Sequence, residues 1–238
     1  MNRAILTIKD LCVSIYDKVL YHNLNFTIYE NDRYMFVGPN GSGKSLLLEL
    51  IAVGYSNTLR QKYKGLTVTG EIIDDDGNNI LLSSNRKKTN ITFISQIELF
   101  YNNYTVKEQI ETSCLAMNID VSTNEIQNAL SLFNTNINLN SKVSKSLSGG
   151  EGKIINLVSG ILKLPKTKLL LLDEPLNHLS FENSKIFNRI INDYTEKNKD
   201  IAIVMVSHCK AINFVNKELR YMNGEFTKKT YKSYDCFE

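Results

Sequence analysis

The pattern of apolar and polar positions predicts strands in the first part of the chain. Residues 5–15 and 24–29 alternate between the two kinds of side chain, as strands do when one face of their sheet is buried. Residues 34–37 form a short apolar run that leads into glycine-rich positions, and residues 45–53 have the pattern of a helix. Further short strand candidates are residues 71–73 and 91–94.

The hydrophobic period becomes helical near residue 105. Thr105 and Glu108 have the spacing of a capping box, in which the hydroxyl and the carboxylate bond to backbone N–H groups at the start of a helix. Ser122 and Glu125 repeat this spacing. We therefore expect two helices between about residues 105 and 133, inserted into an otherwise alternating chain.

Helices and strands alternate in the second half of the chain. We expect helices at residues 148–162, 181–194 and from 210 onward, and strands at residues 168–172 and 201–206. The tail, residues 219–231, contains Asn223-Gly224, a pair that favours a tight hairpin. Strands that alternate with helices predict a parallel sheet covered by helices. The predicted fold class is α/β, in a single domain over residues 1–238.

Composition narrows the class of protein without identifying a function. Hydrophobic residues make up 42% and charged residues 22% of the chain, which is typical of a soluble globular protein. The net charge of +3 is too small to indicate nucleic acid, so we expect no direct nucleic-acid partner. The 4 cysteines lack the spacing of zinc ligands or a redox pair and suit a reducing cytosol. Neither a secretory signal nor a membrane-spanning run is visible, which favours a cytoplasmic location.

Residues 38–45 match every position of the phosphate-binding loop G-x-x-x-x-G-K-[ST]. The loop consists of Gly38, Pro39, Asn40, Gly41, Ser42, Gly43, Lys44 and Ser45. Its glycines let backbone N–H groups converge on phosphate oxygens, Lys44 places a positive charge on the β/γ-phosphates, and the Ser45 hydroxyl can bind Mg²⁺. The helix that follows adds the positive end of its dipole. A predicted strand before the loop and a predicted helix after it provide the context that the motif requires.

Two carboxylates, Asp173 and Glu174, end the apolar strand at residues 169–172. Ligands of parallel sheets bind at the carboxyl ends of the strands. We expect Asp173 to hold Mg²⁺, directly or through water, and Glu174 to orient and deprotonate the attacking water. The alternative is a solvated acidic pair at a strand end, and the phosphate loop upstream favours the catalytic interpretation.

Leu147-Ser148-Gly149-Gly150-Glu151 makes the pattern specific. With this segment, the chain resembles the ATP-binding cassette (ABC) family over almost its whole length, with the motifs in the family's order. The resemblance identifies Tyr16 as the aromatic that stacks on adenine, Gln96 as the Q-loop glutamine, Ser148, Gly149, Gly150 and Glu151 as the signature motif, residues 177–180 as the D-loop, and His208 as the switch histidine. In the family, the signature binds the γ-phosphate held by the opposite subunit.

The resemblance also implies a fold, cofactors and partners. It implies a P-loop NTPase cassette whose RecA-like core carries an N-terminal antiparallel β subdomain and an α-helical subdomain inserted at approximately residues 97–147. The implied cofactors are ATP and Mg²⁺. The implied catalytic residues are Glu174, His208 and Gln96, and the implied metal ligands are Ser45, Gln96 and Asp173. Two cassettes, identical or different, would close head to tail on two ATP molecules, beside a separate transmembrane permease at the inner face of the cell membrane.

Some positions depart from the family pattern. Leu46, counted here with the nucleotide-binding residues, stands where the family usually has a hydroxyl that helps to hold phosphate. Lys153 and Ile154 lie where polar residues and an arginine usually follow the signature, and Ser180 replaces the usual D-loop aspartate. These changes put in question the hydrolysis rate and the communication across the dimer. The catalytic residues themselves are complete.

Two kinds of function remain open from the sequence. A transporter ATPase subunit is favoured by the single-cassette length, the Q-loop and the helical insertion, and the apolar residues 97–101 then suit a surface for the membrane partner. In that case Leu99, Phe100 and Tyr101 are at least partly exposed, whereas core packing predicts their burial. The alternative is a soluble ABC ATPase acting on ribosomes, DNA or cluster assembly, because residues 177–179 are similar to the D-loop of the family's translation factors.

Overall fold

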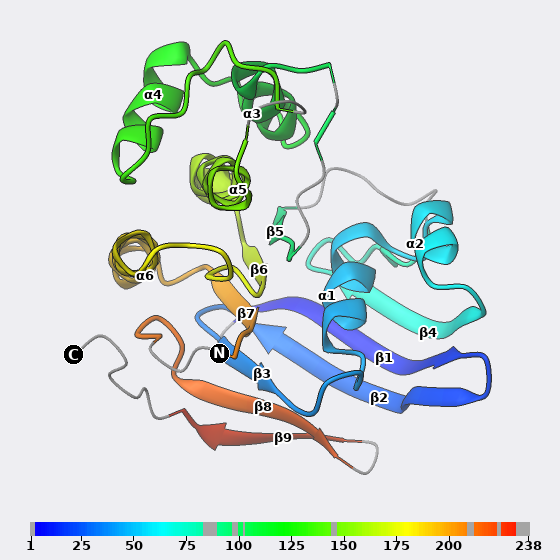
Figure 1. Ribbon diagram of the computed structural model, residues 1–238. Coiled ribbons are helices and arrows are strands. Elements are labelled where there is room, and N and C mark those ends of the chain that lie inside the picture. The colour runs from blue at the N-terminus through cyan, green and yellow to red at the C-terminus, as the bar shows by residue number, and fades with distance from the viewer. Residues whose placement is uncertain are drawn as a thin grey trace.

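The computed structural model describes residues 3–82, 90–96, 100–101, 103–143, 147–208, 212–222 and 225–231. Two β-sheets and a set of helices form the molecule (Figure 1). The larger sheet has the strand order β5-β6-β7-β3-β8-β9. It consists of β5 (Ile91–Ile94), β6 (Leu169–Asp173), β7 (Ala202–Val206), β3 (Arg33–Val37), β8 (Lys217–Met222) and β9 (Glu225–Thr230). Only β9 runs antiparallel to its neighbour, so the carboxyl ends of the other strands meet at one edge.

The central strands β6 and β7 are buried at every residue, which explains their continuous apolar runs. Successive side chains of a strand point to opposite faces, and the residues of β6 divide accordingly between two cores. Leu169 and Leu171 pack in one core with helix α1 (Lys44–Val53), and Leu170 and Leu172 pack in the other with helix α5 (Gly149–Lys163).

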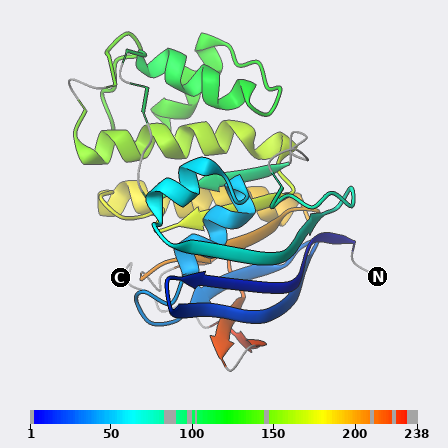
Figure 2. The same cartoon turned by 90° about the vertical axis from the view of Figure 1, so that its right-hand side faces the viewer.

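A smaller antiparallel sheet packs against the core that contains α1. Its strand order is β2-β1-β4, formed by β2 (Lys18–Tyr29), β1 (Ala4–Ile15) and β4 (Leu66–Asp74). A short helix, α2 (Asn57–Lys62), leads from α1 toward β4. Figure 2 shows this sheet on the opposite side of the molecule from the inserted helices.

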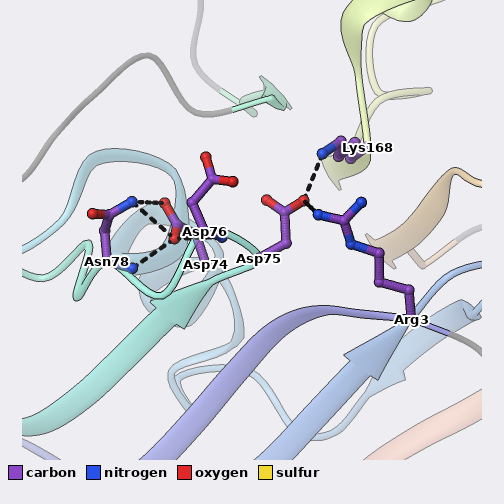
Figure 3. Close-up of polar contacts among 6 residues, drawn as sticks. All are labelled: Arg3, Asp74, Asp75, Asp76, Asn78 and Lys168. Carbon is purple, nitrogen blue, oxygen red and sulfur yellow. Dashed lines mark hydrogen bonds and ion pairs between the residues drawn. The ribbon is translucent and has the colours of Figure 1, made fainter.

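Asp75, directly after β4, ties the smaller sheet to the larger one (Figure 3). Its Oδ2 accepts hydrogen bonds from Arg3 at 3.0 Å and from Lys168 at 2.5 Å. Lys168 immediately precedes β6, so this contact lies at the amino end of the strand. The neighbouring Asp74 shapes the turn, because its Oδ1 accepts the backbone N–H groups of Asp76 and Asn78.

The inserted helices begin at the capping boxes that the sequence predicts. Thr105 and Glu108 cap α3 (Val106–Leu115), and Ser122 and Glu125 cap α4 (Thr123–Ser131). Both helices lie between β5 and α5 in the chain and pack in the same core as α5. The final long helix is α6 (Phe181–Lys197), which Ser180 caps through the N–H of Asn183. The expected α/β fold with an antiparallel N-terminal sheet and inserted helices is thereby confirmed.

The structure differs from the sequence-based expectation in four elements. The helix expected from residue 210 is not formed at residues 212–216, where bends lead directly into β8. Helix α2 was not expected, and β2 and β4 are longer than predicted. The expected turn at Asn223-Gly224 lies outside the described residues, although Met222 of β8 pairs with Glu225 of β9. Within the described ranges, no helix is both long enough and apolar enough to cross a lipid bilayer.

Candidate nucleotide-binding and catalytic site

The phosphate loop connects the carboxyl end of β3 to the first residue of α1, which is Lys44. Gly41 and Gly43 adopt φ angles of 71° and 91°, a left-handed conformation that glycine tolerates best. Gly43 also passes close to Tyr21, since a Cβ built on it would lie 3.0 Å from the tyrosine ring. Gly43 caps α1 with no side-chain hydrogen bond, so the first N–H groups of the helix remain for an anion.

The Lys44 ammonium lies inside this loop. Its Nζ donates hydrogen bonds to the carbonyl oxygens of Gly38 at 2.9 Å and Pro39 at 2.8 Å. Burial lowers the pKa of Lys44, and the nearby carboxylates of Glu174 and Asp173 oppose that shift. A partly desolvated cation among converging backbone groups is well suited to phosphate oxygens.

Ser45 and Asp173 come together from 128 residues apart in the chain. The Ser45 hydroxyl donates to Asp173 Oδ1 at 3.0 Å, which joins the start of α1 to the end of β6. Asp173 is only 2% exposed, and this burial raises its pKa, while the hydrogen bond from Ser45 opposes the shift. A hydroxyl and a carboxylate are oxygen ligands of the kind that Mg²⁺ prefers. Among the described residues, no group of 3 or more His, Cys, Asp or Glu side chains could hold a metal ion.

Glu174 follows Asp173 in an unusual backbone conformation. Its φ of 46° lies in the left-handed region, which few non-glycine residues adopt. The Glu174 N–H donates to the Val206 carbonyl of β7 at 2.8 Å. Its carboxylate accepts the backbone N–H of His208 at 3.2 Å, and Nε2 of His208 lies 3.5 Å from the other carboxylate oxygen. The structure therefore brings two of the predicted catalytic residues into contact.

Gln96 lies at the same edge of the sheet as Asp173. β5 pairs with β6 through Ile94 and Leu172, and Gln96 follows two residues after the end of β5. The Gln96 side chain is exposed. Residues 97–99, including Leu99, lie outside the described part of the chain.

The signature segment forms the beginning of α5. Ser148 and Glu151 form a capping box there, which satisfies two backbone donors. Among the described residues, no atom would lie within 4 Å of a Cβ built on Gly149, so the described part of the chain leaves this turn open on one side. Gly150 is different, because a Cβ there would lie 3.0 Å from the carbonyl oxygen of His178 in the D-loop segment. The signature and the D-loop of one chain are thus in contact.

Tyr16 stands in the turn between β1 and β2, with its side chain 69% exposed. Its ring lies against Gly65, where a Cβ would approach the ring to 2.6 Å. Lys18, two residues later, donates from Nζ to the carbonyl oxygen of Gly41 at 3.1 Å. This contact ties the Tyr16 turn to the phosphate loop. Lys18 was not predicted, because a basic residue two positions after Tyr16 is a weak signal in the sequence.

The residues that depart from the family pattern mostly fill structural positions. Leu46 lies in the first turn of α1 with its side chain buried in the core, which leaves only its backbone to meet a ligand. Ile154 is buried in the opposite core. Near the Q-loop, Phe100 is half-buried against that core, whereas Tyr101 is 58% exposed. Of the expected exposed group, Tyr101 alone is plainly accessible among the described residues.

Comparison with known proteins places these features in a family. A sequence model of the family described as "ABC transporter" matches residues 21–177. ABC transporter F family member 2 of Arabidopsis thaliana is 28% identical over 225 residues, which are 94% of this chain and 29% of that protein. The lipoprotein-releasing system ATP-binding protein LolD of Wigglesworthia glossinidia brevipalpis is 28% identical over 217 residues, 89% of each chain. The chain therefore spans less than a third of the F family protein but most of LolD.

Solved structures share the fold. A dimeric ATP-binding cassette in a post-hydrolysis state, bound to ADP and Pi, superposes with a TM-score of 0.75 at 18% identity, covering 97% of this chain and 100% of that one. A putative ABC transporter ATP-binding protein from Pyrococcus furiosus superposes with a TM-score of 0.63 at 25% identity, covering 90% of this chain and 96% of the other.

Proposed function

The chain belongs to the ABC transporter family of ATP hydrolases, and we propose that it powers a membrane transporter by pairing with a second cassette when ATP is bound. The observation that carries the proposal is the convergence of Lys44, Ser45, Asp173, Glu174 and His208 at the carboxyl edge of the larger sheet. That edge is where parallel sheets bind their ligands.

The geometry supports a division of labour in hydrolysis. The Lys44 ammonium and the open N-terminus of α1 bind the β- and γ-phosphates. Bound by Ser45 and Asp173, Mg²⁺ would neutralise charge on these phosphates. Glu174 orients the attacking water and accepts its proton, and the His208 segment holds the Glu174 carboxylate in place.

The proposed pairing follows from the position of the signature segment. Ser148 and Gly149 lie exposed at the N-terminus of α5, a helix of 15 residues whose first turn is open at Gly149. A second cassette would present its γ-phosphate to this turn, and this chain would do the same in return. Loss of the γ-phosphate on hydrolysis would then separate the pair.

The permease partner is supported by two observations. LolD, whose name assigns it to a lipoprotein-releasing system, aligns over 89% of its own length. Tyr101, close to Gln96 in the chain, presents an aromatic ring that is 58% exposed. Large aromatic side chains near a functional site suit contact with another protein. We place the chain accordingly at the inner face of the cell membrane, with no direct nucleic-acid partner.

A soluble ABC ATPase that acts on ribosomes, DNA or cluster assembly is the second candidate. It is favoured by Asn177-His178-Leu179, in which His178 adopts a left-handed φ of 65° and contacts Gly150 of the signature. The sequence similarity to two F family members of Arabidopsis thaliana also favours this second candidate.

Sedimentation separates the two candidates. Cells that produce a tagged Glu174→Gln chain are lysed with ATP and Mg²⁺, and the lysate is fractionated on a density gradient that resolves membranes from ribosomes. The transporter proposal expects the chain with the membranes and its release at alkaline pH, as for a peripheral protein. Sedimentation with ribosomes, lost on ribonuclease treatment, would contradict the transporter proposal and support the second candidate.

A further inference from the structure

A buried lysine joins the signature helix to the beginning of the Q-loop. Lys153 lies in the second turn of α5 and is 0% exposed. Its Nζ donates a hydrogen bond to the carbonyl oxygen of Ser95 at 3.0 Å. Ser95 directly precedes Gln96. A buried ammonium is unfavourable unless hydrogen bonds compensate for its lost hydration, so its position here is closely determined.

A second side chain from the same helix bonds to the same oxygen. Asn156, one turn along α5, donates from Nδ2 to the Ser95 carbonyl at 3.2 Å. One peptide oxygen thus receives two donors from one helix, and one of these donors is charged. Charge-assisted hydrogen bonds are about twice as strong as neutral ones, so Lys153 is the dominant contact.

Close packing of α5 on β5 makes this arrangement rigid. A Cβ built on Gly160 would lie 2.4 Å from Cδ1 of Ile94, so a larger residue there would force the helix or the Ile94 side chain to move. Ile94 in turn pairs with Leu172, the residue before Asp173. The Ser95 carbonyl that Lys153 holds is therefore at the edge of the sheet where the catalytic carboxylates lie.

We infer that Lys153 is a positioning residue that fixes the backbone at Ser95 and so sets where Gln96 enters the site. Because Lys153 lies on the helix that begins with Ser148–Glu151, a displacement of that helix when two cassettes pair is transmitted to Gln96 through the Ser95 peptide. Lys153 holds the Ser95 peptide and is proposed to act on hydrolysis through Gln96. Its charge also acts to lower the pKa of Asp173. The inference rests on the proposed function and on the catalytic role that the family resemblance implies for Gln96.

The test compares two lysines of the same helix. Lys153→Met removes the donor and keeps a side chain of similar length. Lys163→Met is the matched control, because the Lys163 ammonium bonds to Ser113 of α3, away from the site. We expect Lys153→Met to lower kcat for ATP by about tenfold, the effect of losing one strong orienting contact, with KM within about twofold. Lys163→Met is expected to keep kcat. The inference would be overturned if Lys153→Met had the same kcat as the wild type, or if Lys153→Met and Lys163→Met lost kcat equally.

Two further variants distinguish a positioning role from general damage. Lys153→Gln keeps a hydrogen-bond donor and is expected to recover part of the lost kcat. If Lys153 acts through Gln96, then the double variant Lys153→Met/Gln96→Ala has the same kcat as Gln96→Ala alone. Additive losses in the double variant would contradict the inference.

Gln96→Ala tests the premise separately. A reduced kcat in Gln96→Ala, together with a normal kcat in Lys153→Met, would overturn only the inference. A normal kcat in Gln96→Ala would show that Gln96 has no catalytic role and would overturn the inference, while the roles proposed for Lys44 and Glu174 would stand. If Lys153→Met does not fold, Asn156→Ala replaces it, with Asn198→Ala at the end of α6 as its control. The inference is supported if Asn156→Ala loses kcat, by less than the loss expected for Lys153→Met, while Asn198→Ala does not. Equal kcat values in the two asparagine variants oppose the inference.

Discussion

The Glu174 carboxylate is held by the backbone of His208, whose N–H donates to Oε2 at 3.2 Å, while His208 Nε2 lies 3.5 Å from Oε1. The two side chains differ in environment, because the carboxylate is 7% exposed and the imidazole 71%. The carboxylate is therefore fixed, whereas the imidazole can still turn toward a bound phosphate.

This arrangement predicts that Glu174→Gln retains ATP binding and loses hydrolysis. Glutamine preserves the shape of the side chain and the contact with the His208 N–H, but it cannot accept a proton from water. We expect kcat to fall by roughly 10²–10⁴-fold in a steady-state phosphate-release assay. Glu182→Gln, at the exposed start of α6, is the control. Near-normal turnover in Glu174→Gln would indicate another base.

The Glu174→Gln variant also tests whether two cassettes pair when ATP is bound. We expect the Glu174→Gln chain to be mainly monomeric without nucleotide and dimeric with ATP, because each phosphate loop needs the signature turn of another cassette. Light scattering with and without ATP measures the mass. A dimer that is stable without nucleotide would exclude the proposed switch, and a monomer at saturating ATP would point to a different partner cassette.

The variant Lys44→Ala tests whether ATP binds at the phosphate loop. Burial lowers the pKa of Lys44, so the free protein disfavours the charged form that phosphate oxygens would stabilise. ATP affinity is expected to fall by about a hundredfold or more, because the charge-assisted contacts of Lys44 with phosphate are lost. Each tenfold loss of affinity corresponds to about 1.4 kcal/mol of binding free energy. Isothermal titration measures the affinity, with Lys9→Ala on the exposed face of β1 as the control. Unchanged affinity in Lys44→Ala would refute the site.

The residues near the Q-loop allow packing to be distinguished from docking. Phe100 is half-buried against the core of the inserted helices, so Phe100→Ala is expected to destabilise the fold by about 1–3 kcal/mol. Tyr101→Ala is expected to change stability by less than about 1 kcal/mol because most of the side chain is exposed. Urea unfolding measures both values. If Tyr101→Ala also leaves membrane sedimentation unchanged, then this ring does not contribute to docking.

The lowered pKa of Glu196 predicts that the protein loses stability in acid. Hydrogen bonds and charge from Lys199 and Arg33 lower its pKa from 4.5 to about 2. Its contribution to stability is therefore fully present above about pH 4.5 and disappears as the pH falls toward 2. Glu196→Gln is expected to have a lower urea midpoint than the wild type at pH 6, with the difference shrinking as the pH is lowered to 2.5. A difference that does not change with pH would contradict this assignment.

The elements best predicted from the sequence depend on neighbouring residues. The phosphate loop and the capping boxes at Thr105, Ser122 and Ser148 are contiguous patterns with a local physical cause, and the structure contains each of these elements. The apolar run of β6 was equally clear, because a strand buried on both faces needs no alternation.

The contacts that depend on tertiary structure were not predictable in this way. The bond from Lys18 to Gly41 and the bond from Lys153 to Ser95 join residues 23 and 58 positions apart, and neither has a local signature. The helix expected from residue 210 was wrong because an apolar pattern over a few residues suits a packed bend as well as a helix. Ile212 and Phe214 are buried there without helical structure.

The division of β6 between two cores has a consequence for insertions and deletions. Leu169, Leu171 and Asp173 occupy alternate positions of the strand, and their side chains therefore point to the same face of the sheet. On that face the Asp173 carboxylate meets Ser45, in the first turn of α1. Exchanging one leucine for another aliphatic residue leaves this geometry intact. Adding or removing a single residue would exchange the odd and even positions and turn the carboxylate to the opposite layer, even with an unchanged apolar composition. In β6, therefore, a change of two residues would keep the carboxylate on the same face of the sheet, but it would still move the strand end by roughly 7 Å, so the position of Asp173 tolerates neither kind of change in length.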